Sequence, residues 1–242
     1  MTDTGDGRLV LLRHGQSEWN AESVYRLGKR PADHRWRAGR DPGRAAAGQE
    51  GLWPDVVHTS VLRRTIHTAD LALAACDRDW IPVRRSWRLN ANHYGALQGR
   101  DKAEVAAEAG DVQVMLWRRS SAVAPPAAPA GHPYSQFDDP RYAGLPPEAR
   151  PHGESLDDVM ARLLPYWYDE IVPGLRAGWC VLVVSHGNTL RALVRHLDRL
   201  AEREVAELEI LTATPLVYRL DADLRPLRRG GQDLGPLLTT FR

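Results

Sequence analysis

An arginine, a histidine and a glycine directly follow an apolar run near the start of the chain. The run covers residues 9–12, and Arg13, His14 and Gly15 come next. A short apolar run that changes abruptly to polar residues predicts a buried strand ending in a loop, where ligands bind in open α/β sheets. A guanidinium matches phosphate oxygens, a neutral imidazole can carry a phosphoryl group, and glycine lets the backbone approach an anion. These residue types predict phosphoryl chemistry.

The pattern of an apolar run followed by His-Gly occurs a second time. Residues 180–184 are apolar, Ser185, His186, Gly187 and Asn188 follow, and residues 189–193 have helical spacing. A lone histidine at a strand end is usually a polar bystander, but a repeated His-Gly at two strand ends changes that balance. The sequence therefore predicts two imidazoles that face one anion pocket.

These two segments resemble the histidine phosphatase superfamily. Further motifs are similar to one branch of it, the cofactor-dependent phosphoglycerate mutases, and they stand at residues 59–64, 86–90, 93–99, 117–119 and 215–218. The resemblance implies interconversion of 3-phosphoglycerate and 2-phosphoglycerate in glycolysis and gluconeogenesis. It also implies a phosphohistidine primed by 2,3-bisphosphoglycerate, so the expected partner is a small phosphorylated carboxylic acid.

The resemblance also assigns roles to single residues. His14 would carry the phosphoryl group, while Arg13, Arg64 and His186 would stabilise the charge of the transferring group. The substrate-binding residues implied by the resemblance are Ser17, Asn20, His93, Tyr94, Lys102, Arg118, Arg119, Gly187 and Asn188. Arg63, next to Arg64, is expected to be a solvated surface residue.

The chain departs from the family at its proton-transfer position. Where the family has Leu-Asn-Glu-Arg-His-Tyr-Gly, this chain has Ala91 and Asn92 in place of the Glu and the Arg. Acid–base catalysis is typically worth about 10²–10⁴-fold, so we expect severely reduced turnover. Glu104 and Glu108 are weak replacements, because both lie well along the next predicted helix. Two alternatives stay open, namely a weak histidine-type phosphatase and a non-catalytic phosphate-binding remnant.

A second departure covers residues 24–49, which show no helical or strand period. A surface loop or a basic phosphate-binding patch would both account for this stretch. A third hypothesis is a compensated frameshift over about residues 24–48, because residues 24–28 can be encoded as GTT TAC CGG TTG GGN. Read one base later, that string encodes Phe-Thr-Gly-Trp, which the family carries there. We expect resequencing of the gene to find these codons; codons that cannot give Phe-Thr-Gly-Trp would refute the hypothesis.

Composition limits the class of protein. A chain of 242 residues predicts one domain, 1–242, with a Pro-rich loop insertion at about 120–155. The net charge of +1 gives no case for a nucleic acid partner. The N-terminal residues are too polar for a signal peptide, and no apolar stretch approaches the roughly 20 residues that span a membrane. Cys76 and Cys180 are predicted to be reduced core thiols of a cytoplasmic protein. No cluster of Asp and Glu suggests a metal, and the resemblance allows a homo-oligomer without identifying its contact.

The periodicities predict a three-layer α/β/α fold, a mostly parallel sheet with helices on both faces. Expected strands lie at residues 8–13, 55–58, 80–83, 179–184 and 216–220. Expected helices run from Thr59 or Ser60 as cap to residue 75, from 101, over 112–119, over 154–171 with a kink at Pro165, from 189, and over about 202–208. The Pro-rich loop is expected to cover the site.

Overall fold

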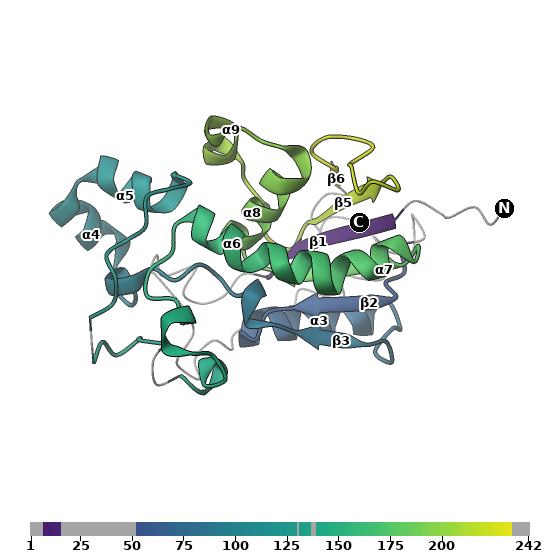
Figure 1. The fold of residues 1–242 in the computed structure, drawn as a ribbon, viewed down its shortest axis with the longest axis horizontal. Coiled ribbons are helices and arrows are strands. Elements are labelled where there is room, and N and C mark those ends of the chain that lie inside the picture. The colour runs from purple at the N-terminus through teal and green to yellow at the C-terminus, as the bar shows by residue number, and fades with distance from the viewer. Residues whose placement is uncertain (1–6, 16–51, 130, 137–138, 234–242) are drawn as a thin grey trace, which may run out of the picture.

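The computed structural model describes residues 7–15, 52–129, 131–136 and 139–233 (Figure 1). Its strands are β1 (Gly7–Arg13), β2 (Val56–Thr59), β3 (Val83–Arg85), β4 (Cys180–Ser185), β5 (Pro215–Leu220) and β6 (Gln232–Asp233). Its helices are α3 (Arg63–Ala75), α4 (Lys102–Ala109), α5 (Asp111–Arg119), α6 (Leu156–Tyr166), α7 (Val172–Arg176), α8 (Gly187–Asp198) and α9 (Glu202–Glu207). A π turn, Trp167–Ile171, joins α6 to α7.

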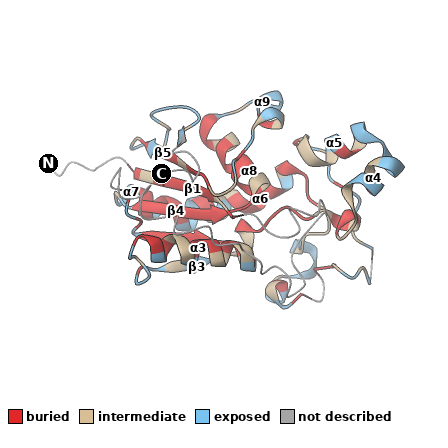
Figure 2. Ribbon diagram, turned by 180° about the vertical axis from the view of Figure 1, so that it is seen from behind, coloured by how far each residue is buried: buried red, intermediate tan, exposed pale blue. Residues whose placement is uncertain are grey.

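The described strands form one sheet in the order β3-β2-β4-β1-β5-β6. The pairs β2–β3, β2–β4 and β1–β4 are parallel, whereas β5 runs antiparallel to β1 and β6 antiparallel to β5. Figure 2 shows the central strands as the most buried part of the molecule. The predicted mostly parallel α/β/α architecture is therefore confirmed.

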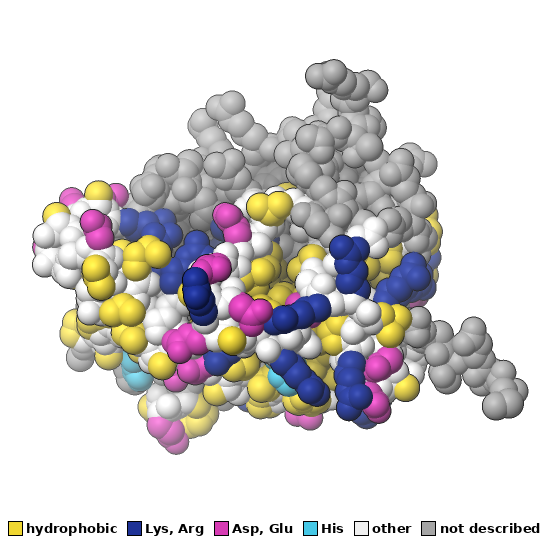
Figure 3. Space-filling model, turned by 90° about the horizontal axis from the view of Figure 1, so that it is seen from above, with side chains coloured by type: hydrophobic (Ala, Val, Ile, Leu, Met, Phe, Trp, Pro, Cys, Tyr) yellow, Lys and Arg dark blue, Asp and Glu magenta, His cyan; other side chains and the backbone are white. Residues whose placement is uncertain are grey.

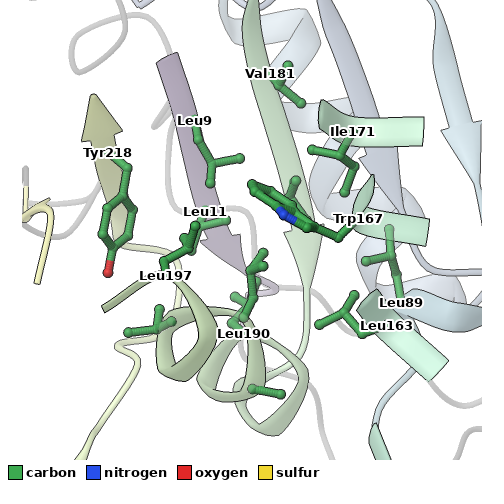
Figure 4. Close-up of a cluster of buried hydrophobic side chains, with 14 of the residues drawn as sticks. Leu9, Leu11, Leu89, Leu163, Trp167, Ile171, Val181, Leu190, Leu197 and Tyr218 are labelled. Carbon is green, nitrogen blue, oxygen red and sulfur yellow. The ribbon is translucent and has the colours of Figure 1, made fainter. Parts of the chain in front are cut away.

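Successive apolar side chains of β1 point to opposite faces of the sheet, so both faces need helices to cover them. Leu9 and Leu11 belong to one core cluster with side chains of α6, α7 and α8. Val10 and Leu12 belong to another cluster with Ala69 and Leu73 of α3. In Figure 4 the first cluster packs around Trp167, which is 1% exposed. A strand covered on both faces needs apolar residues at every position, which accounts for the unbroken apolar run in the sequence.

Helix α3 begins later than the predicted cap implied. It starts at Arg63 with Leu62 as its N-cap residue, and no side chain caps it. Ser60 accepts a hydrogen bond from the Leu62 N–H, but its hydroxyl also bonds to His186. The prediction of Thr59 or Ser60 as the helix cap was therefore wrong, since Ser60 lies in the turn before the helix.

Strand and helix boundaries differ at two other places. β3 begins at Val83, the last residue of the predicted 80–83 strand, and it is the edge strand that Pro82 indicated. The predicted 154–171 helix divides into α6 and the π turn, which begins directly after Pro165 and Tyr166. A proline removes one backbone donor from a helix, so the disturbance expected at Pro165 takes the form of a widened turn.

The Pro-rich segment does not form the expected cover over the site. In its described residues it contains two 3₁₀ turns, Pro140–Tyr142 and Pro147–Ala149, and none of these residues lines the pocket described below. Instead, its Tyr142 and Glu154 side chains lie buried behind the site. The expectation of a covering loop was wrong because these buried side chains anchor the segment to the scaffold.

Both cysteines have the state predicted for them. Cys76 and Cys180 are free and buried, and burial raises the pKa of the Cys180 thiol to about 11. None of the helices in the described ranges has the length and apolar character that a membrane crossing needs.

Stability should fall in acid partly because His58 is buried in β2. Its Nδ1 lies 2.9 Å from the Tyr166 hydroxyl, and burial, with Arg84, lowers the pKa of His58 to about 4. The unfolded chain binds this proton near pH 6.5 and the folded chain only near pH 4, so the stability present at high pH is lost as the pH falls below 6.5. At pH 5.5 the loss is about 1.4 kcal/mol relative to pH 8.

Urea unfolding at pH 8 and at pH 5.5 measures how much the free energy of unfolding falls between the two pH values. The variant His58→Gln should lose about 1.4 kcal/mol less than the natural chain between the two pH values, whatever its stability at pH 8. A matched variant, His132→Gln, changes a partly exposed histidine and should keep the natural pH dependence. An unchanged pH dependence in His58→Gln would refute the assignment.

Candidate functional site

The site forms where two parallel strands end side by side. Register pairs Arg13 of β1 with Ser185 of β4, and the His14 N–H donates to the Ser185 carbonyl at 3.0 Å. The next residues along each strand are therefore His14 and His186. Their ring centroids lie 5.0 Å apart at an interplanar angle of 62°. The structure brings together the two imidazoles that the repeated motif predicted.

Arg64, on the first turn of α3, joins the two rings. Its Nε lies 3.2 Å from His14 Nε2 and 3.2 Å from His186 Nδ1. A guanidinium N–H only donates, so both ring nitrogens present lone pairs to it. His14 Nδ1 lies 2.7 Å from the Gly15 carbonyl, which only accepts. His14 is therefore protonated at Nδ1, and its nucleophilic atom is Nε2, which is unprotonated and accepts from Arg64.

The proton positions around His186 follow in the same way. Its Nδ1 accepts from Arg64, so Nε2 carries the proton and donates to Ser60 Oγ at 3.0 Å. Ser60 then donates to Thr65 Oγ1 at 2.5 Å, and Thr65 donates to the Leu62 carbonyl at 2.7 Å. This chain of hydroxyls fixes the tautomer and the ring orientation of His186, as supporting groups do for functional histidines.

Both imidazoles are held in the neutral form. Burial, with the nearby charge of Arg64, lowers the pKa of His14 well below its usual 6.5. Burial, Arg64 and His14 lower the pKa of His186 in the same direction. A neutral His14 has the lone pair that an attack on phosphorus requires.

A pocket opens in front of the two histidines. Its cationic side chains are Arg13, Arg64, Lys102, Arg118, Arg119 and Arg191. The other lining residues are His14, Ala91, Asn92, Tyr94, His186, Gly187, Asn188, Leu208, Glu209 and Ile210. Figure 3 shows Lys and Arg side chains gathered beside the lobe that carries α4 and α5. A pocket with this excess of positive charge suits a small polyanion.

Asn188 and Arg191 of α8 hold one wall of the pocket in place. Asn188 Nδ2 donates to Asn92 Oδ1 at 2.8 Å and to the Tyr94 hydroxyl at 3.3 Å. Arg191 Nη1 donates to Asn188 Oδ1 at 3.1 Å, and Arg191 Nη2 donates to the Val205 carbonyl. Burial, with Arg119, lowers the pKa of Arg191 to about 10, which leaves it cationic near neutral pH.

Most residues predicted for the site lie in this one pocket, namely Arg13, His14, Arg64, Tyr94, Lys102, Arg118, Arg119, His186, Gly187 and Asn188. Arg63 points to solvent, as expected. Ala91, at the family's proton-transfer position, lines the pocket, whereas Glu104 and Glu108 do not. Ser17 and Asn20 lie outside the described residues.

His93 is the predicted substrate-binding residue that the structure does not bring to the pocket. It is fully buried, its Nδ1 lies 2.6 Å from Glu154 Oε2, and its Nε2 lies 2.7 Å from the Tyr142 hydroxyl. Glu154 also accepts from Arg162 Nε at 2.6 Å. Both ring nitrogens are thus occupied on the side away from the pocket, and His93 anchors the backbone that carries Tyr94.

Sequence reasoning missed Ser60, Arg191 and Glu209. Arg191 stands three positions after Asn188, so helical spacing could have placed both on one face. Ser60 and Glu209 gave no such signal, because a turn and an irregular connection position them. In the described ranges, no group of three or more His, Cys, Asp or Glu could hold a metal ion.

Comparison with known proteins agrees with this geometry. The sequence profile of the histidine phosphatase superfamily (branch 1) matches residues 9–139 and 134–229. The chain therefore belongs to the histidine phosphatase superfamily. A solved mycobacterial glucosyl-3-phosphoglycerate phosphatase in complex with VO3 has a TM-score of 0.63 and 25% identity, over 91% of this chain and 95% of that one. Bacillus stearothermophilus YhfR shares the fold with a TM-score of 0.67 at 19% identity, over 94% and 98%.

Curated relatives define the family more narrowly. The 2,3-bisphosphoglycerate-dependent phosphoglycerate mutase of Streptomyces griseus is 53% identical over 235 residues, which cover 95% of this chain and 91% of that protein. That of Rhodococcus jostii is 50% identical over 238 residues, covering 98% and 94%. Within the superfamily, this chain belongs to the 2,3-bisphosphoglycerate-dependent phosphoglycerate mutase family.

The buried Glu154 should be essential for stability. Burial opposes its ionisation, but Arg162 and His93 outweigh that effect and lower the pKa of Glu154. In Glu154→Gln the Arg162 guanidinium, also buried, loses its counter-charge. Breaking such a buried pair costs about 3–5 kcal/mol, which urea unfolding would measure.

The exposed pair Arg203–Glu207 provides the control, because its side chains are 91% and 72% exposed. Glu207→Gln should leave the free energy of unfolding nearly unchanged. An equally small effect of Glu154→Gln would contradict the anchoring role given to the His93–Glu154–Arg162 group.

Proposed function

We propose that this chain interconverts 3-phosphoglycerate and 2-phosphoglycerate through a phosphohistidine on His14. The observation that supports the proposal most directly is the pair of neutral imidazoles that share the Arg64 Nε–H at the floor of a cationic pocket. Family membership supports the same reaction, since the relatives named above are mutases of this kind.

His14 acts as the nucleophile of the proposed reaction. The Gly15 carbonyl accepts a hydrogen bond from Nδ1–H, so the lone pair is on Nε2, beside Arg64 in the pocket. As Nε2 bonds to phosphorus, positive charge develops on the ring, and the same carbonyl stabilises the Nδ1–H. Little other covalent chemistry is needed, because phosphoryl transfer depends mainly on positioning and electrostatics.

Three side chains are placed to stabilise the transferring group. Arg13 and Arg64 supply fixed positive charge in the pocket that His14 lines, and Arg13 is held by its Nη1 bond to the Ile210 carbonyl at 2.7 Å. His186 faces the same space and can donate once a phosphoryl group raises its proton affinity. The N-terminus of α8, at Gly187 and Asn188, adds a favourable dipole for an anion.

Lys102, Arg118 and Arg119 form a second cationic group on α4 and α5, apart from the histidines. Burial, with Arg118, lowers the pKa of Lys102. Two cationic ends suit a substrate with a phosphate at one end and a carboxylate at the other. The same residues fit 2,3-bisphosphoglycerate, which when bound would supply the phosphoryl group that primes His14.

Ala91 leaves the expected proton-transfer position without a carboxylate. We therefore propose that turnover is low for a family member, by up to the 10²–10⁴-fold that acid–base catalysis is worth. The alternative function is a weak phosphatase in which water removes the phosphoryl group from His14. The fold similarity to a glucosyl-3-phosphoglycerate phosphatase supports keeping that alternative.

The cellular setting is also a proposal. Two free, buried thiols favour the cytoplasm, where such thiols stay reduced. A homo-oligomer stays a prediction from the family resemblance.

The function is tested by assaying 3-phosphoglycerate conversion with added 2,3-bisphosphoglycerate, together with intact mass after brief incubation. The natural chain should gain one phosphoryl group and form 2-phosphoglycerate. His14→Ala should abolish both, because Nε2 is lost, while His132→Ala should change neither. Phosphate release without 2-phosphoglycerate would indicate the phosphatase. The absence of a phosphoryl group on His14 in a folded chain would refute both activities.

A further inference from the structure

Glu209 is the only carboxylate among the described residues that line the pocket. It lies between α9 and β5, while Ala91 lies in the segment before α4. Among the described residues, its carboxylate makes neither a hydrogen bond nor an ion pair, and it is exposed. An acidic side chain in a pocket with six cationic neighbours is therefore free to meet a bound molecule.

The site itself fixes the backbone of Glu209. Arg13 Nη1 donates to the carbonyl of Ile210 at 2.7 Å, and Arg119 Nη1 donates to the carbonyl of Leu208 at 3.3 Å. The residues on both sides of Glu209 are thus held by arginines that belong to different parts of the pocket. The carboxylate also acts on Arg13, whose pKa burial lowers and the charge of Glu209 raises.

A carboxylate here has an electrostatic cost. Like charges repel, so Glu209 weakens the binding of an anionic substrate to an otherwise cationic pocket. That cost is offset if Glu209 exchanges a proton with the substrate and so accelerates the reaction. The position expected for proton transfer holds Ala91, which cannot do this. Among the described residues that line the pocket, Tyr94 alone carries a hydroxyl group, and that hydroxyl accepts a hydrogen bond from Asn188.

We propose that Glu209 is the catalytic acid–base of this chain, in place of the missing carboxylate at Ala91; this inference rests on the proposed mutase function. The substrate hydroxyl oxygen attacks the phosphorus on His14 Nε2, so that an O–P bond forms while the N–P bond breaks. The N–P electron pair returns to the imidazole, and the hydroxyl proton moves to the Glu209 carboxylate. In the second half-reaction His14 takes the other phosphoryl group, and Glu209 returns the proton to the oxygen released.

A double-mutant cycle tests the proposal with the natural chain, Glu209→Gln, Ala91→Glu and the double variant. Glu209→Gln should lower kcat at least about tenfold in the natural background. In the Ala91→Glu background the restored carboxylate shares the task, so the same change should cost less than about threefold. Glu209→Gln should not raise KM, since it removes a repulsive charge from the pocket.

Orthovanadate binding, followed by calorimetry, gives a readout independent of turnover. Glu209→Gln should bind vanadate as tightly as the natural chain or more tightly, which shows that the anion site is intact. Glu207→Gln, two residues earlier and outside the pocket, is the matched control and should keep the natural kcat.

The outcomes separate this inference from the function on which it rests. An unchanged kcat in Glu209→Gln, with active Ala91→Glu, overturns the role of Glu209 and leaves the mutase proposal standing. A large loss in Tyr94→Phe together with an unchanged Glu209→Gln assigns the proton to the phenol. Inactivity of all four proteins, without phosphohistidine, overturns both proposals.

Discussion

The parallel pairing of β1 with β4 is the constraint on which the site depends. Register runs without interruption from Arg8 with Cys180 to Arg13 with Ser185, so His14 and His186 leave the sheet at the same level. A slip of one residue would turn every side chain of the slipped strand to the opposite face and separate the two rings. Apolar side chains on both faces of both strands fix that register. The core therefore places the chemistry, and Arg64 only has to reach across from α3.

A second constraint is that the pocket must remain cationic although its arginines are partly buried. Helix α9 and its connection to β5 satisfy this by offering carbonyl oxygens instead of carboxylates, at Val205 in the helix and at Leu208 and Ile210 after it. A carbonyl accepts a hydrogen bond from a guanidinium without neutralising its charge. The positive potential that attracts an anion is therefore preserved, while Arg13 Nη1, Arg119 Nη1 and Arg191 Nη2 each have a carbonyl partner. Glu209 is the exception in this connection, because it brings a carboxylate to the cationic pocket. A negative charge that weakens anion binding needs a chemical reason.

The sequence predicts the elements that follow strong periodicity and the residues that end them. The two His-Gly segments and the buried strands follow from local patterns, whereas the pocket arginines of α5 follow from the family resemblance. What it does not predict comes from contacts between distant segments. His93 looks like a ligand by its motif, yet Glu154 and Tyr142, from 49 to 61 residues away, occupy both of its nitrogens. Glu209 enters the site because β5 runs antiparallel to β1, which brings the start of β5 to the edge where β1 ends. The proline-rich composition predicted a loop at 120–155. It could not show whether that loop covers the pocket or packs behind the site.

The substitution at Ala91 changes the chemistry of the site but leaves its scaffold in place. The backbone there is held from behind, because Arg162 Nη2 donates to the carbonyls of Asn90 and Ala91 at 3.0 and 3.2 Å. The Thr189 hydroxyl also donates to the Asn90 carbonyl at 2.7 Å. These contacts involve only main-chain acceptors, so they do not depend on which side chain stands at position 91. A carboxylate restored at position 91 would therefore be attached to a backbone that is already held in place. A chain that has lost one side chain, and not its supporting structure, needs only one other carboxylate within reach of the substrate hydroxyl to remain an enzyme.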